Sequence, residues 1–229
     1  MFAGATIVFD LDGTLVDTAL DLTNALNDVL IRRGHEPVPI EAIRGCVGHG
    51  ARVMIEQALA RIGADGDVDR MLAEFLANYE TNIARESRPY PGALAALDRL
   101  VRLGARLAIC TNKRESLSRL LLQKLEIEHY FTALAGRHTF PVAKPHPGHL
   151  TGVIALAGGD PSRSVMVGDS DIDLNTAKAA AVPAILVSFG YGASPLHGFA
   201  SEAVIDHFDA LDGHAARLLD GGAGSPSRG

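Results

Sequence analysis

The residues best suited to chemistry are two aspartates, Asp10 and Asp12, followed by Gly13 and Thr14. They come directly after the apolar, β-branched run Thr6–Phe9, which is typical of a strand buried on both faces. Side chains two positions apart on an extended chain point the same way, so both carboxylates are expected to project together from the strand's carboxyl end. Open α/β sheets bind ligands at that edge. Because neighbouring carboxylates repel unless a cation or a proton lies between them, this stretch predicts a cation- or proton-binding site.

Three later segments place polar residues at the same predicted edge. They are Thr111 and Asn112 after the strand 107–110, Lys144 in a proline-rich loop, and Asp169 and Asp173 after the strand 164–167. Each has an ordinary explanation by itself: a turn at a strand end, a surface lysine, and acids that favour a helix N-terminus. Their joint occurrence favours one composite site.

The elements that must position these residues follow from the hydrophobic pattern. After Asp17, apolar residues recur at helical spacing, with one helix expected over residues 51–62, and no strand is expected up to residue 86. From Tyr90 onward, predicted strands alternate with predicted helices, the last of them over residues 208–219, which indicates a doubly wound parallel sheet. The predicted fold is therefore an α/β core with an inserted all-helical cap domain. The core is assigned to residues 1–17 and 87–221, the cap to residues 18–86, and a disordered tail to residues 222–229.

Composition narrows the class of protein. The chain has 229 residues, 47% of them hydrophobic, which suffices for one sizeable core with a smaller domain. Its net charge of −6, without a basic run, argues against a nucleic-acid-binding surface. No apolar segment is long enough to span a bilayer, so no membrane partner is expected. The two cysteines and the absence of a signal-peptide pattern make a cytoplasmic location the expectation.

The string from Asp10 to Asp17 resembles the first motif of the haloacid dehalogenase-like hydrolase superfamily. The segments carrying Thr111, Lys144 and Asp169 are similar to that superfamily's later motifs, in the same order, so the resemblance runs from Thr6 to Tyr191. It implies that Asp10 is a nucleophile attacking phosphorus and that Asp12 is a general acid and base. Attack by an anion on a phosphate dianion needs charge neutralisation, and the resemblance implies Mg²⁺ as the cofactor.

The remaining roles are also implied by the resemblance. The metal ligands would be Asp10, the main-chain carbonyl of Asp12, and Asp169, with Asp173 orienting a metal-bound water. Lys144 would neutralise the nucleophile and the phosphoryl oxygens. The Thr111 hydroxyl and the Asn112 amide would donate hydrogen bonds to the phosphoryl group.

The predicted cap carries a candidate substrate loop. Gly48, His49 and Gly50 precede Arg52, which could grip a carboxylate, while Gly48 could bring main-chain N–H groups close to an anion. A plain interhelical turn is an equally open interpretation. The stretches 47–50, 136–141 and 188–192 are similar to bacterial phosphoglycolate phosphatases, which implies a small phosphorylated metabolite, first of all 2-phosphoglycolate, as substrate. His146 departs from that family, whose members commonly carry an acid there.

Five rival functions share parts of this pattern. A sugar phosphomutase of the β-phosphoglucomutase kind shares the motifs and the cap, and a phosphatase for another small metabolite would share the chemistry. A dehalogenase lacks the second carboxylate, and a receiver-type signalling module has another segment order. A non-catalytic phosphate-binding module would have little use for Asp12. The sequence leaves a monomer and a homodimer equally open.

Overall fold

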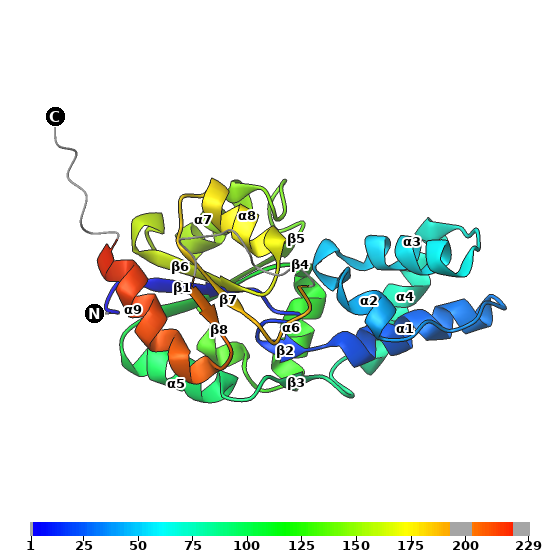
Figure 1. Cartoon of the computed structure of the whole chain (residues 1–229), viewed down its shortest axis with the longest axis horizontal. Helices are drawn as coiled ribbons and strands as arrows, with labels where there is room; N and C mark the ends of the chain where they lie inside the picture. Colours follow the sequence, from blue (N-terminus) through cyan, green and yellow to red (C-terminus); the bar gives the residue numbers. More distant parts are fainter. Residues whose placement is uncertain (1, 193–202, 222–229) are drawn as a thin grey trace.

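A sheet of six parallel strands forms the centre of the computed structural model, which describes residues 2–192 and 203–221. Across the sheet the strands are β5 (Ala133–Arg137), β4 (Arg106–Arg114), β1 (Thr6–Phe9), β6 (Ser164–Gly168), β7 (Ala184–Val187) and β8 (Ala203–Ile205) (Figure 1). The chain adds strands on one side of β1 and then on the other. Since β1 lies between β4 and β6, the strand order reverses at the carboxyl end of β1, where such sheets bind ligands.

Helices cover both faces of this sheet, as Figure 1 shows. Alternate residues of β1 serve opposite faces: Ile7 and Phe9 belong to the larger apolar core, whereas Val8 belongs to a second cluster under α7 and α8. The core helices are α5 (Ala93–Arg102), α6 (Glu115–Lys124), α7 (Pro147–Leu156), α8 (Asp171–Ala179) and α9 (Leu211–Gly221), with 3-10 turns η2 (Glu128–Tyr130), η3 (Pro161–Arg163) and η4 (Phe208–Ala210). This arrangement confirms the predicted doubly wound α/β core.

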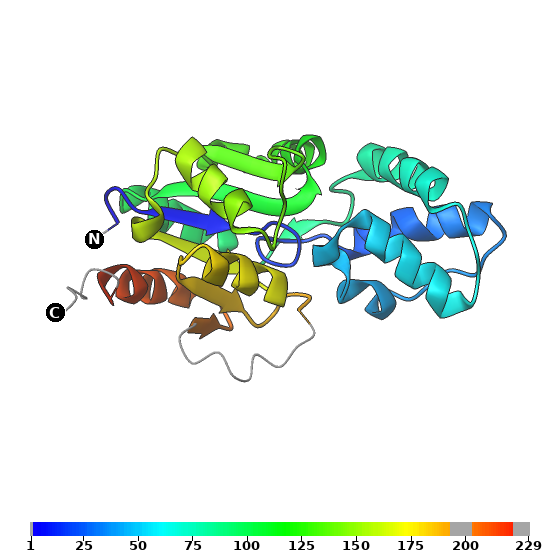
Figure 2. The same cartoon turned by 90° about the horizontal axis from the view of Figure 1, so that it is seen from above.

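A group of helices, here called the helical insertion, separates β1 from the rest of the sheet. Its members are α1 (Ala19–Arg32), α2 (Glu41–Arg44), the 3-10 turn η1 (Val47–His49), α3 (Ala51–Ile62) and α4 (Val68–Asn82). Figure 2 shows it in blue and cyan beyond the carboxyl ends of the strands. Two segments connect the core with the helical insertion, one leading into it and one leading back. They pair as a small antiparallel ladder of β2 (Val16–Asp17) and β3 (Arg88–Pro89). They lie next to the boundaries expected after residues 17 and 86.

Two predicted elements differ from the structure. The strand expected to end at Cys110 continues to Arg114, with a shift in its pairing to β5 between those residues. Thr111 and Asn112 therefore lie within β4, because the main chain stays extended there. Their polar side chains belong to the site and not to the apolar core. The last helix, expected from residue 208, begins as η4 and becomes α-helical only at Leu211.

Two other calls concern the ends and the surface of the chain. The predicted tail, residues 222–229, lies outside the described residues. Among the helices of the described part, none has the length and apolar character needed to cross a bilayer.

Candidate active site

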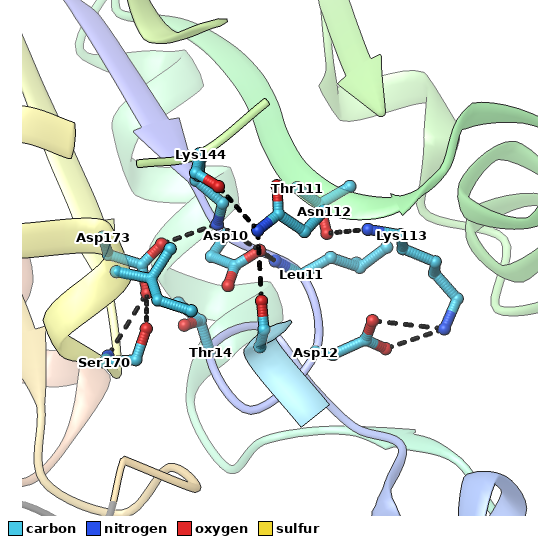
Figure 3. A network of polar contacts seen from close by, with 12 residues as sticks. Asp10, Leu11, Asp12, Thr14, Thr111, Asn112, Lys113, Lys144, Ser170 and Asp173 are labelled. Carbon is cyan, nitrogen blue, oxygen red and sulfur yellow. Dashed lines mark hydrogen bonds and ion pairs between the residues drawn. The ribbon is translucent and has the colours of Figure 1, made fainter. Parts of the chain in front are cut away.

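The site is built where β1, β4 and β6 end, and Figure 3 shows its polar contacts. Asp10 follows β1 directly and is 3% exposed. Its Oδ1 accepts a hydrogen bond from the Leu11 N–H at 2.7 Å and lies 2.9 Å from Lys144 Nζ. A buried carboxylate held by an ammonium group has the position and charge required of a nucleophile.

Asp10, Asp169 and Asp173 form a buried acidic cluster whose ligand oxygens all lie within 4.8 Å of one another. Burial raises the pKa of Asp10 and of Asp169 above the usual aspartate range, and the neighbouring Asp173 carboxylate acts in the same direction on both. Lys144 opposes this but supplies one positive charge to three carboxylates. Such a set of oxygen donors, short of positive charge, fits a hard divalent cation.

The two later acids of this cluster are held differently: Asp169 is bound by residues of other segments, and Asp173 is bound by its own. Asp169 Oδ2 accepts hydrogen bonds from the N–H groups of Tyr191 at 2.6 Å and Gly192 at 3.2 Å, and its Oδ1 accepts from Thr14 Oγ1 at 3.2 Å. Asp173 Oδ2 accepts from Ser170 Oγ at 2.7 Å in the first turn of α8. Asp173 thus caps its helix, as the ordinary explanation predicts, and also reaches the site.

Lys144 is held at both ends. Its ammonium group lies 2.6 Å from Asp173 Oδ1, and its side chain is 1% exposed. Its main-chain N–H donates to His149 Nδ1 at 3.1 Å, and its carbonyl accepts from Asn112 Nδ2 at 3.1 Å. Burial lowers the pKa of His149 to about 4, which keeps the imidazole neutral and able to accept this hydrogen bond.

The carboxylate of Asp12 does not point the same way as that of Asp10, contrary to the expectation from their spacing. Its carboxylate turns to Lys113, whose Nζ lies 2.9 Å from Oδ1 (Figure 3). It also accepts a hydrogen bond from Thr18 Oγ1 at 2.7 Å. The chain leaves the extended conformation after β1, so the two side chains diverge. The acidic cluster accordingly does not include the carboxylate of Asp12.

The turn that separates the two acids depends on Gly13. Gly13 has φ +83°, and a Cβ there would lie 2.6 Å from Asp169 Oδ2. No larger residue fits between the first acidic segment and the metal-ligand candidate opposite it.

The predicted phosphate donors differ in their contacts. The Thr111 Oγ1 accepts a local hydrogen bond from the Lys113 N–H at 3.2 Å. Asn112 Nδ2 donates to the carbonyls of Gly48 and Lys144, each at 3.1 Å. Donation from Asn112 to a phosphoryl group would require one of these bonds to open. In this structure Asn112 instead ties the helical insertion to the lysine loop.

A cavity of about 390 Å³ lies between the helical insertion and the core. Asp12, Asn112 and Lys113 line it from the core, and Arg52 lines it from α3. Arg52 forms an ion pair with Asp69, and its side chain is 48% exposed. Gly48 approaches the other side of the site, since a Cβ there would lie 3.7 Å from Ser170 Oγ.

Two residues of the site were missed by the sequence reasoning. Lys113 is buried against Asp12, and its place two positions after Thr111 on an extended strand could have nominated it. The Tyr191 hydroxyl accepts from the N–H groups of Thr18 and Ala19 and donates to Asp17 Oδ1 at 2.6 Å. No local pattern indicates that a tyrosine after β7 reaches the start of α1.

Known proteins are similar to this chain in sequence and in fold. A phosphoglycolate phosphatase of Mesorhizobium japonicum is 49% identical over 221 residues, covering 95% of this chain and 97% of that protein. A phosphoglycolate phosphatase of Agrobacterium fabrum is 45% identical over 207 residues, 89% of each chain. The crystal structure of a predicted phosphoglycolate phosphatase from Haemophilus somnus has a TM-score of 0.86 at 26% identity and covers 93% of this chain and 98% of that one. Residues 7–187 match the haloacid dehalogenase-like hydrolase profile, which spans all four acidic and basic segments of the site, and the chain belongs to that family.

Proposed function

We propose that this protein is a Mg²⁺-dependent phosphomonoester hydrolase that converts 2-phosphoglycolate to glycolate and phosphate. One observation supports it above the others: the Asp10 carboxylate is buried beside Lys144 and two further acids, whereas Asp12 faces a cavity. This separates a nucleophile in a charge-neutralising environment from an acid that a leaving group can reach.

The reaction proceeds in two displacements. An Asp10 oxygen attacks phosphorus and forms a P–O bond while the ester bond breaks, and Asp12 gives its proton to the leaving oxygen. Asp12 then takes a proton from water, whose oxygen attacks phosphorus and releases phosphate and the Asp10 carboxylate. Lys144 neutralises Asp10 and the phosphoryl oxygens throughout, and the Thr111 hydroxyl donates to the phosphoryl group.

Asp10 and Asp169, with the main-chain carbonyl of Asp12, would hold the Mg²⁺, and Asp173 would orient its hydration. The fit rests on three buried carboxylates around one lysine. When bound, the cation supplies the positive charge that attack on a phosphate dianion requires.

The choice of substrate rests on the relatives and on the cavity. The Mesorhizobium japonicum and Agrobacterium fabrum proteins are named phosphoglycolate phosphatases. The helical insertion, as a cap, would cover a small phosphorylated acid, with Arg52 lining the cavity and Gly48 next to Ser170. A cytoplasmic location and a monomeric or homodimeric state remain predictions.

The test is phosphate release from a panel of monoesters, with Mg²⁺ or with EDTA. The panel contains 2-phosphoglycolate, β-glucose 1-phosphate, other sugar phosphates and nucleotides. We expect Mg²⁺-dependent release, with a kcat/KM for 2-phosphoglycolate more than about tenfold above the rest, or roughly 1.4 kcal/mol in transition-state binding. Conversion of β-glucose 1-phosphate without net phosphate release would instead assign a sugar phosphomutase.

The nucleophile is tested with Asp10→Asn. Without a carboxylate to attack phosphorus, turnover should fall by at least about four orders of magnitude, as in other enzymes that lose a nucleophile. Asp171→Asn is the matched control, because Asp171 is exposed and stands outside the acidic cluster. Retained turnover in Asp10→Asn would refute the assignment.

A further inference from the structure

Lys113 is a buried lysine that the reaction scheme above leaves without a task. It extends from β4, its side chain is 6% exposed, and its Nζ lies 2.9 Å and 3.2 Å from the two carboxylate oxygens of Asp12. The Tyr79 hydroxyl on α4 is 2.9 Å from the same nitrogen, and the Tyr79 ring centroid is 4.4 Å away. The ammonium group is therefore fixed by one residue of the core and one of the helical insertion.

Burial works against the charged form of this ammonium group, but the Asp12 carboxylate and the Tyr79 hydroxyl, each 2.9 Å from Nζ, stabilise it. Tyr79 itself is neutral, because burial raises its pKa to about 12. A cation lined by an aromatic face and a hydroxyl can exchange one anionic partner for another without losing its other contacts.

The cavity next to Lys113 favours anions. Among its lining residues, which all belong to the described part of the chain, Asp12 is the single carboxylate. The lining cations are Arg52, Lys113, Arg114 and Arg137. The opposite wall is largely apolar and includes Leu22, Phe75 and Leu76, so a leaving group rich in hydroxyls would find few partners there.

Geometry links Lys113 to the leaving group. Asp12 must reach the ester oxygen in order to protonate it, and Lys113 Nζ lies within hydrogen-bonding distance of Asp12. An anionic group one carbon away from the ester oxygen would thus lie beside the same ammonium group. A longer or neutral leaving group would not form this ion pair with the Lys113 ammonium group.

We propose that Lys113 is the specificity-determining residue for this site and recognises the carboxylate of a short phosphorylated acid, with Tyr79 orienting the ammonium group. The inference rests on the phosphatase function proposed above. Arg52 is the rival reader of the carboxylate, but it lies at the rim and is paired with Asp69. The buried Lys113 discriminates between a carboxylate and a neutral group more strongly than the half-exposed Arg52 does, because its ammonium group is already desolvated.

The experiment compares two esters of equal carbon number, 2-phosphoglycolate and 2-hydroxyethyl phosphate. The wild-type protein should prefer the acid, and the measured quantity is the ratio of their kcat/KM values. Lys113→Met should lower this ratio on the order of 100-fold, mainly through KM for the acid. Lys113→Arg, which keeps the charge, should retain most of the preference. Arg114→Met, which removes a neighbouring cation of the same wall, should change the ratio less than about threefold.

The outcomes separate the two proposals. Equal losses for both esters in Lys113→Met would mean that Lys113 acts through Asp12, which overturns carboxylate recognition and leaves the phosphatase function intact. A ratio that collapses in Arg52→Met instead would transfer the role to Arg52. If the wild type hydrolyses neither ester, the proposed function fails. The role of Lys113 is then decided by calorimetry, which compares the binding of 2-phosphoglycolate to Asp10→Asn with its binding to the double variant Asp10→Asn/Lys113→Met. Equal affinities of the two variants would refute carboxylate recognition by Lys113.

Discussion

At the scale of single residues, Asp10 and Asp12 are paired with different lysines. Lys144 serves Asp10 and Asp173, and Lys113 serves Asp12. Two buried lysines of different segments thereby keep Asp10, the proposed nucleophile, and Asp12, the proposed proton donor, electrostatically distinct. Removing one partner of such a pair leaves a buried charge uncompensated, which costs more than the pair itself contributes.

His149 gives a pH-dependent prediction. It is fully buried, supports Lys144 through Nδ1, and has its pKa lowered to about 4 by burial, against about 6.5 in an unfolded chain. The unfolded state thus binds the proton more readily. The stability contributed by neutral His149 is complete above pH 6.5 and is lost as the pH falls towards 4, by about 3 kcal/mol in all.

His149→Asn keeps a hydrogen-bond acceptor for the Lys144 N–H but removes the imidazole group that takes up a proton. Urea unfolding between pH 7 and pH 4 should therefore show a shallower loss of free energy in the variant than in the wild type, by about that 3 kcal/mol. His146→Asn, at an exposed position of the same loop, should follow the wild-type curve. Parallel curves for the wild type and His149→Asn would contradict the assignment.

At the scale of elements, β4 and α1 do more than pack. β4 stays extended beyond its apolar segment and thereby presents Thr111, Asn112 and Lys113 to the site from one continuous strand. The start of α1 is bound by the Tyr191 hydroxyl, while the Tyr191 N–H holds Asp169. The connection to the helical insertion and the acidic cluster are therefore joined through one residue, by its hydroxyl and by its main-chain N–H.

Asp21 secures the second connection. This buried acid in the first turn of α1 accepts hydrogen bonds from the N–H groups of Glu86 and Ser87 and from Ser87 Oγ at 2.6 Å. Asp21→Asn would turn an amide group towards at least one of these donors, and we expect the free energy of unfolding to fall by about 2–3 kcal/mol. Urea titration measures it.

The control for this variant lies on the same helix. Asp28 is exposed, and Asp28→Asn should change the free energy of unfolding by less than about 0.5 kcal/mol. A loss in Asp21→Asn no larger than that of the control would show that Asp21 does not secure the connection.

At the scale of the whole molecule, the acidic cluster joins segments more than 150 residues apart, so a bound cation would stabilise the fold. Mg²⁺ at about 100 times its Kd would add about 2.7 kcal/mol, or roughly 5–10 °C in Tm for a chain of this size. Thermal melts with Mg²⁺ and with EDTA measure this shift. Asp169→Asn should abolish most of it because a cluster ligand is lost, and Asp171→Asn should keep it.

The composite nature of the molecule also explains where the cavity lies. Neither the sheet nor the helical insertion encloses it alone: Asp12 and Lys113 come from one side, Arg52 and Tyr79 from the other.

A Mg²⁺-dependent Tm shift that persists in Asp169→Asn would place the cation outside the acidic cluster. The acidic cluster would then not be the Mg²⁺ site.

Much of the fold follows from local properties of the sequence. The run Thr6–Phe9 forms a strand because it is apolar and β-branched, and α3 occupies the predicted residues 51–62 because apolar spacing and flanking glycines fix its ends. The order of strands and helices, and the four segments at one sheet edge, follow from the same periodicities. The candidate acids and Lys144 could be named from the sequence for this reason.

Only the tertiary structure decided how those residues are paired. Asp12 and Lys113 are 101 positions apart, Tyr191 and Thr18 are 173 apart, and Asn112 meets Gly48 across 64. Such partners are selected by the packing of the helical insertion against the sheet and by the turn at Gly13, which directs Asp12 away from Asp10. The sequence determined the elements and their chemical groups because those depend on near neighbours. The structure determined which charges meet, because that depends on distances between segments that no local pattern encodes.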